Sequence, residues 1–230
     1  MSTILNIDTS TTVCSVALSS EGMIIHHCED FQGMNHATLL SGFIKECLEV
    51  AKQHEYKIDA IAVSLGPGSY TGLRIGLSEA KGLAYALDVP LIGIDTLKLM
   101  AVHIMFNVDL DPDAVIAPMI DARRMEVYTA VYDMALNPLL PPTPLILEEG
   151  ALADFHSPER PLYYGGDGSE KARSILNSSH TLWVPDVYPL AVDMLPLAEQ
   201  AFMNRDFLDL AYSVPTYLKE YQATKPRKLF

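Results

Sequence analysis

The chain has 230 residues, of which 49% are hydrophobic, enough for a buried core in one large or two small domains. Its formal net charge of −13, with one basic run at 225–228, disfavours tight, direct nucleic-acid binding, because neutralised phosphates supply most of that affinity. Three cysteines without a C-x-x-C pair favour reduced thiols in a cytoplasmic protein, and no apolar run approaches the ~18 residues of a membrane span.

The first half of the chain has the pattern of five strands and two helices. The strands are expected at residues 3–8, 13–18, 23–27, 58–65 and 91–94. A turn signal at 19–22 predicts that the first three strands are consecutive and antiparallel, whereas the apolar run 58–65 is typical of a buried parallel strand. Apolar residues at helical spacing predict one helix from Asn35, a good N-cap, to about His54, and a second over about 71–87.

An acidic, proline-containing link at residues 107–113 is the best candidate for a boundary between two lobes. We therefore expect an N-terminal lobe at 1–106 and a smaller C-terminal lobe at 107–230, whose last segment can return to the first lobe. In the second lobe, strands are expected at 114–120, 125–132, 162–164 and 181–184, and helices at 169–176 and 194–203. The proline-rich run 137–144 cannot be a central strand throughout. Both lobes begin with a hairpin ahead of α/β elements, which predicts a duplicated unit.

The most distinctive stretch is the run Gly-Pro-Gly-Ser-Tyr-Thr-Gly-Leu-Arg-Ile-Gly at residues 66–76, between a strand and a helix. A tight turn ahead of a helix N-terminus suits either a bound anion or a closely packed backbone. The run matches neither the P-loop nor the dinucleotide pattern, because Thr71 stands where both require glycine. The motif alone therefore favours a structural turn over a phosphate cradle. Gly72, Gly76 and Gly82 each cost about 1 kcal/mol inside a helix, which indicates close approach of another backbone.

Two other turns are candidates for contact with a nucleotide. Asp8 ends the first strand ahead of Ser10, and it either holds a metal–phosphate group or caps the turn with its own side chain. The Gly-Gly-Asp-Gly run that contains Gly166 suits a nucleotide backbone, although a plain turn is the simpler interpretation. The seven histidines include no pair three or four residues apart, so we expect no metal site, and His36 is interpreted as a helix N-terminal residue.

Four charged residues form a corner between two expected strands: Asp121, Arg123, Arg124 and Glu126. A solvated hairpin turn is the favoured interpretation of this charged corner, and binding of an anion or a partner is the alternative. The chain has serine, histidine and aspartate, but no G-x-S-x-G elbow supports a catalytic triad.

Four segments together resemble the bacterial TsaB (YeaZ) family over nearly the whole chain. These segments are residues 4–10, 66–76, 121–128 and 215–219, the last ending in Lys219 where the family usually has arginine. The resemblance implies a two-lobed α/β fold of the actin, Hsp70 and sugar-kinase class, which is ribonuclease-H-like. It also implies a non-catalytic partner of TsaD, the enzyme that transfers a threonylcarbamoyl group onto adenosine beside the tRNA anticodon. The small ATPase TsaE joins that pair.

Two departures from the catalytic relatives favour this non-catalytic role. TsaD carries an H-x-x-x-H metal pair, and alignment puts Thr96 and Met100 at those two places. Kinase-like relatives carry glycine and often a cation in the first phosphate hairpin, where this chain has Ser10. The resemblance therefore assigns ATP and the divalent metal to the partner subunits, and tRNA contact to the complex alone. A vestigial nucleotide site is then expected at Asp8, Ser10, Gly66, Gly68 and Gly166.

In the family, the helix that begins near residue 36 and the helix after the Gly-Pro-Gly loop pair with their counterparts in TsaD. The interface candidates are His36, Leu39, Phe43, Gly72, Leu73, Ile75 and Gly76. We expect Gly76→Arg to block pairing with little effect on the folded monomer, and the same surface to form a homodimer when the partner is absent. An ATP-dependent phosphotransferase or ATPase of the same fold class remains the alternative. A ribonuclease-H-type nuclease is disfavoured, because it needs several acids around two metals and only Asp8 is suitably placed.

Overall fold

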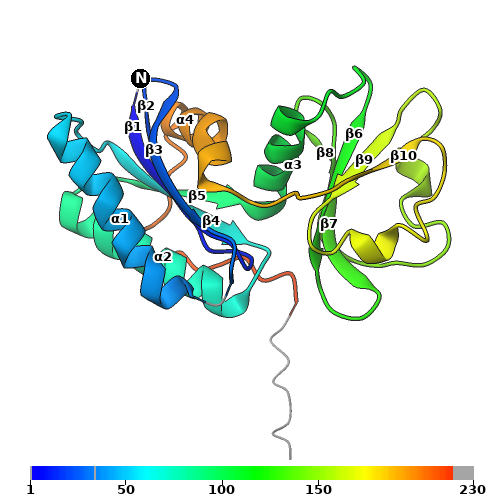
Figure 1. The fold of residues 1–230 in the computed structure, drawn as a ribbon, viewed down its shortest axis with the longest axis horizontal. Coiled ribbons are helices and arrows are strands. Elements are labelled where there is room, and N and C mark those ends of the chain that lie inside the picture. The colour runs from blue at the N-terminus through cyan, green and yellow to red at the C-terminus, as the bar shows by residue number, and fades with distance from the viewer. Residues whose placement is uncertain (1, 34, 220–230) are drawn as a thin grey trace, which may run out of the picture.

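The computed structural model describes residues 2–33 and 35–219, so the basic run 225–228 lies outside the described residues. The described residues form two five-stranded sheets (Figure 1). The first sheet has the order β3-β2-β1-β4-β5, with β1 (Thr3–Asp8), β2 (Cys14–Ser20), β3 (Met23–Asp30), β4 (Ala60–Gly66) and β5 (Leu91–Asp95). The second has the order β10-β9-β6-β7-β8, with β6 (Val115–Asp121), β7 (Glu126–Tyr132), β8 (Pro138–Ile146), β9 (Leu162–Gly165) and β10 (Thr181–Val184).

The two sheets repeat one topology. In each, the first three strands form consecutive antiparallel pairs, and the last two add in parallel on the other side of the first strand. The two-lobed α/β fold with a duplicated unit is thereby confirmed. The proline-rich β8 is an edge strand. Prolines are tolerated there because an edge strand has a neighbour on one side only, so it does not need every backbone N–H to donate a hydrogen bond.

Helices α1 (His36–Gln53) and α2 (Tyr70–Leu87) cover one face of the first sheet side by side (Figure 1). Both stripes predicted from the sequence face this sheet, with Leu40 and Ile44 of α1 and Leu77 and Ala80 of α2 in its buried core. Asn35 occupies the N-cap position of α1, but its side chain makes no capping hydrogen bond. Helix α2 does have a side-chain cap, since the Ser69 Oγ accepts a hydrogen bond from the Gly72 N–H at 3.2 Å.

A helix that the sequence patterns did not predict, α3 (Thr96–Asn107), lies between the two sheets (Figure 1). Leu99 and Val102 pack with the core of the first sheet, whereas Met100 and Ile104 pack with the core of the second. Because α3 is apolar on both sides, it lacks the one-sided stripe by which a surface helix is recognised. Asp95 caps it by accepting from the Lys98 N–H at 2.8 Å.

The last helix, α4 (Leu195–Asn204), returns the chain to the first lobe, where it packs opposite α1 and α2 on β1 and β5. The predicted helix at 169–176 is wrong, because only a short 3₁₀ turn, Glu170–Ala172, forms there. The Ser169 hydroxyl donates to the Gly166 carbonyl at 2.7 Å and accepts from the Trp183 indole at 2.9 Å, which holds this segment as a turn. Within the described residues, no helix is both long and apolar enough to span a membrane.

Candidate functional site: the cleft between the lobes

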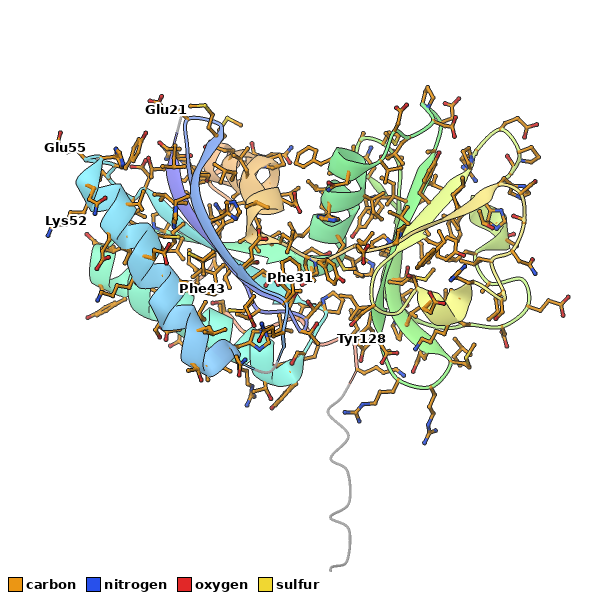
Figure 2. The ribbon with its side chains drawn as sticks, in the orientation of Figure 1. Glu21, Phe31, Phe43, Lys52, Glu55 and Tyr128 are labelled. Atoms are coloured by element: carbon orange, nitrogen blue, oxygen red, sulfur yellow. The ribbon has the colours of Figure 1, made fainter. Side chains whose placement is uncertain are left out.

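A cleft of about 1420 Å³ lies between the two lobes. Its walls come from residues 10–12, 36–37, 67–72, 120–124 and 216–219, with further single side chains. Most of these segments follow the carboxyl ends of parallel strands, which is where open α/β sheets bind ligands. Figure 2 places Tyr128 of β7 at this junction.

The Gly66–Gly76 run packs tightly against the turn that follows β1. The Ser69 N–H donates to the Ser10 carbonyl at 2.6 Å, and the Thr9 hydroxyl donates to the Gly72 carbonyl at 2.8 Å. A Cβ atom on Gly68 would lie 2.2 Å from the Ser10 oxygen, and one on Gly72 would lie 2.1 Å from the Thr9 oxygen. The closely approaching backbone that these glycines require therefore belongs to the same chain.

This packing corrects part of the predicted partner interface. Leu73 and Gly76 are buried inside the first lobe, and Gly72 is buried except where it lines the cleft, so none of the three lies on the outer face of α2. A Cβ on Gly76 would lie 2.3 Å from the Thr9 hydroxyl, so Gly76→Arg disrupts the fold and cannot serve as a probe of pairing. Gly82, by contrast, is exposed and has no atom within 4 Å of an added Cβ.

The other interface candidates, His36, Leu39, Phe43 and Ile75, are half-buried. The His36 Nε2 donates to the Val13 carbonyl at 3.1 Å, so this side chain fixes the start of α1 against the β1–β2 turn. Phe43, labelled on α1 in Figure 2, and Ile75 both pack partly against the core beneath the two helices. The helices are joined at their surface by the Ser41 hydroxyl, which donates to Glu79 at 2.8 Å.

Asp8 is fully buried behind the Ser10 turn and does not line the cleft. Its carboxylate accepts from the Ser10 N–H at 3.1 Å and from the Ser10 hydroxyl at 2.9 Å. Burial raises the pKa of Asp8 to about 6, and the hydrogen bonds from Ser10 partly offset that increase. The carboxylate therefore caps the Ser10 turn, as the capping interpretation predicted, and it is shielded from the cleft.

Of the other residues predicted for a vestigial nucleotide site, Ser10 and Gly68 line the cleft, whereas Gly66 and Gly166 do not. Gly66 has φ +115°, and a Cβ there would lie 2.7 Å from the Thr216 carbonyl oxygen. Gly166 has φ +113°, and its Cβ would lie 2.3 Å from the Met119 oxygen. Both glycines are required by backbone conformation and close packing rather than by a ligand.

The charged corner faces the cleft from the second lobe. Arg123 and Arg124 both have positive φ, at 68° and 51°, and the Asp121 carboxylate accepts from the Arg123 N–H at 3.2 Å. Lys171 stabilises the turn, because its ammonium contacts the Asp121 carboxylate and donates to the Arg124 carbonyl at 2.8 Å. Within the described residues, neither guanidinium pairs with a carboxylate.

The last described residues of the chain cross the cleft. The Thr216 N–H donates to the Leu65 carbonyl at 2.8 Å, and the Tyr217 ring stacks on Tyr70 with centroids 5.2 Å apart. The Arg74 Nε donates to the Tyr217 hydroxyl at 3.2 Å, which ties this segment to α2. Lys219 then pairs with the Glu126 carboxylate of the second lobe. The segment thus joins both walls of the cleft.

Known proteins share both this sequence and this fold. The family model for TsaD, the tRNA N6-adenosine threonylcarbamoyltransferase, matches residues 30–149. The tRNA threonylcarbamoyladenosine biosynthesis protein TsaB of Escherichia coli is 30% identical over 227 residues, which are 96% of this chain and 96% of that protein. The chain belongs to the TsaB family. The TsaB protein of Bacillus subtilis is 29% identical over the same coverage. YeaZ from Pseudomonas aeruginosa aligns with a TM-score of 0.79 at 29% identity, covering 95% of this chain and 100% of that one.

Membership of the TsaB family gives two positions on α3 a particular meaning. Thr96 and Met100, which the sequence analysis aligned with a metal-binding histidine pair, are both buried on α3. Met100 packs with the core of the second sheet, and its methyl group lies where a side chain on Gly166 would project. Neither side chain offers the nitrogen or carboxylate ligand that such a site needs.

The sequence patterns of this TsaB-family chain did not predict that Lys171 and Lys219 contact the charged corner. Each makes contacts with residues more than 40 positions away, Lys171 with Asp121 and Lys219 with Glu126. Contacts of this range leave no trace in local spacing or periodicity. The only available signal was the position of Lys219 in the final motif.

Proposed function

We propose that this chain is the non-catalytic scaffold and activator subunit in the formation of threonylcarbamoyladenosine on tRNA. It would pair with a TsaD-type catalytic subunit and help to recruit a TsaE-type ATPase, and it would contact tRNA only within that complex. The observation that supports the proposal is that Thr96 and Met100, which the family resemblance aligns with the metal-binding histidines of TsaD, are buried and offer no imidazole ligand. Near full-length similarity to proteins named for this pathway supports it. ATP and a divalent metal for the reaction would then belong to the partner subunits.

The outer surface of α1 and α2 is the part of the molecule that best suits a helical partner. A groove of about 350 Å³ runs between these helices, and it is lined by Glu79 of α2 and by six residues of α1: Ser41, Ile44, Lys45, Leu48, Glu49 and Lys52. Gly42 of α1 and Gly82 of α2 are both exposed, and an added Cβ on either would meet no atom within 4 Å. Helices approach most closely where their side chains are small, so these two glycines, rather than Gly72 and Gly76, mark the proposed contact.

Reconstitution tests the proposal directly. Alone, the chain is expected to leave tRNA unmodified when threonylcarbamoyl-adenylate is supplied, because it lacks the metal ligands of its catalytic relatives. Addition of the TsaD-type and TsaE-type proteins from the same organism should restore the nucleoside, measured by mass spectrometry of digested tRNA. Omission of this chain from the full mixture is the control. Transfer by the isolated chain would overturn the proposed role.

One observation favours the alternative of an ATP-dependent phosphotransferase or ATPase. Arg123 and Arg124, without carboxylate partners among the described residues, line a cleft of about 1420 Å³. The buried Asp8 and the internally packed Gly68 argue against a working phosphate site. We therefore expect calorimetry with Mg-ATP to show binding weaker than micromolar. Micromolar binding that disappears in an Arg123→Ala, Arg124→Ala double variant would support the enzyme instead.

A further inference from the structure

Three side chains that the sequence does not connect meet at the edge of the first sheet, away from the cleft. His26 and Cys28 lie two positions apart on the edge strand β3, so their side chains project on the same side of the strand. Glu46 reaches them from α1. Their donor atoms all lie within 4.8 Å of one another. Histidine spacing alone predicted no metal site, because it cannot detect ligands that come from two different elements.

We propose that His26, Cys28 and Glu46 bind a zinc ion that links β3 to α1. One imidazole, one thiolate and one carboxylate are a donor set typical of Zn²⁺, and three protein ligands leave the fourth tetrahedral position for water. This inference concerns a site outside the cleft and outside the groove between α1 and α2, and it is independent of the proposed function.

The distances suit a tetrahedral ion. With Zn–S near 2.3 Å and Zn–N near 2.0–2.1 Å, tetrahedral geometry places sulfur and nitrogen about 3.6 Å apart. The Cys28 Sγ and the His26 Nε2 are 3.7 Å apart. The Glu46 oxygen lies 2.7 Å from the same nitrogen, the distance of a hydrogen bond, and it would move outward by roughly 0.6 Å when an ion replaces the shared proton. Glu46 has room for this shift, since its side chain is 56% exposed.

The surroundings of the cluster favour a cation. The carboxylates of Glu46 and Glu29 both bring negative charge close to Cys28. The same two carboxylates attract a divalent ion, which binds the thiolate in place of the proton. His26 has a side chain that is 30% exposed, so the ion can enter from solvent. Cys47 of α1, whose thiol interacts with that of Cys28, closes the inner side.

Cobalt and zinc titrations of the untagged, reduced protein test this site. Co²⁺ should produce tetrahedral d–d bands and a near-ultraviolet thiolate charge-transfer band, and about one equivalent of Zn²⁺ should abolish both. Cys28→Ser should remove the charge-transfer band. His26→Gln and Glu46→Gln should each weaken Zn²⁺ binding by about tenfold or more. Loss of a residue that only hydrogen-bonds to a metal ligand already lowers metal affinity by about tenfold, so loss of a ligand should cost at least as much.

Matched variants control for surface binding. His27→Gln alters the neighbouring histidine on the opposite face of β3, and Glu49→Gln alters a carboxylate of α1 that pairs with Lys45 instead. Both should bind Zn²⁺ like the wild type, and Zn²⁺ should raise the melting temperature of these two variants but not of Cys28→Ser. Absence of a charge-transfer band, or equal Zn²⁺ affinity across all variants, would overturn the site. Far-ultraviolet circular dichroism confirms that each variant is folded before titration.

Discussion

Gly72→Ala is expected to destabilise the isolated protein by about 3 kcal/mol or more, the cost of forcing extra volume into a packed core and losing a buried hydrogen bond. The new methyl group would lie 2.1 Å from the Thr9 carbonyl oxygen, a backbone atom that cannot rotate away. The turn after β1 would have to move, and with it the hydrogen bond from the Thr9 hydroxyl to the Gly72 carbonyl. Urea denaturation followed by circular dichroism measures the free energy of unfolding.

Gly82→Ala is the matched control, on the same helix but with open space around the added Cβ. Because alanine is the better helix former, this variant should be more stable by up to about 1 kcal/mol. The two substitutions are chemically identical, so the opposite signs isolate the effect of packing against Thr9. A Gly72→Ala protein that unfolds at the same urea concentration as the wild type would show that the glycine run is not packed as described.

Gly82→Arg should strongly weaken association with the TsaD-type subunit while leaving the folded monomer intact. An arginine there projects directly away from the core, where it would separate two closely packed helices. We expect the dissociation constant to rise by at least about 100-fold, equivalent to about 2.8 kcal/mol. Gly42→Arg on α1 should act in the same way, because its Cβ also meets open space. Gel filtration and calorimetry with the purified partner measure the change.

The control for added charge is Ser179→Arg, an exposed position in the second lobe. Arginine is favourable within a helix, so the melting temperatures of Gly82→Arg and Gly42→Arg should not fall below that of the wild type. Pairing retained at wild-type affinity by both glycine variants would place the interface on another surface. Loss of pairing in Ser179→Arg as well would show that charge, rather than shape, controls association.

The sequence was sufficient to predict most of the strands and the antiparallel pairing of the first three, because the hydrophobic patterns in this chain are local and strong. A local pattern of four or more residues marks each of these elements: the hairpins, the buried strand β4, and the helices α1 and α2. Helix α3 escaped prediction for a physical reason. Leu99 faces one sheet and Met100 the other, so burial on both sides removes the polar face that defines an amphipathic period.

The candidate site was harder to predict, because the same residue type serves opposite purposes on one helix. In the sequence, Gly76 and Gly82 both indicate a place where another part of a protein can come close to the helix. Only the structure shows that Gly76 is packed against the same chain, whereas Gly82 faces open space. The corner at Arg123 and Arg124 was recognisable from its charges, but its position opposite α2 depends on the closure of the two lobes. The metal-ligand cluster combines a strand and a helix, and spacing rules compare residues within one element.

Helix α3 also limits how the molecule can be divided. A fragment that ends in the link at 107–113 would expose the side of α3 that carries Met100 and Ile104, and it would lack α4, which covers the first sheet. A fragment that begins there would lose the helix on which its own sheet is packed. Neither lobe has a complete core of its own, so the two halves of the duplicated topology form one cooperative folding unit.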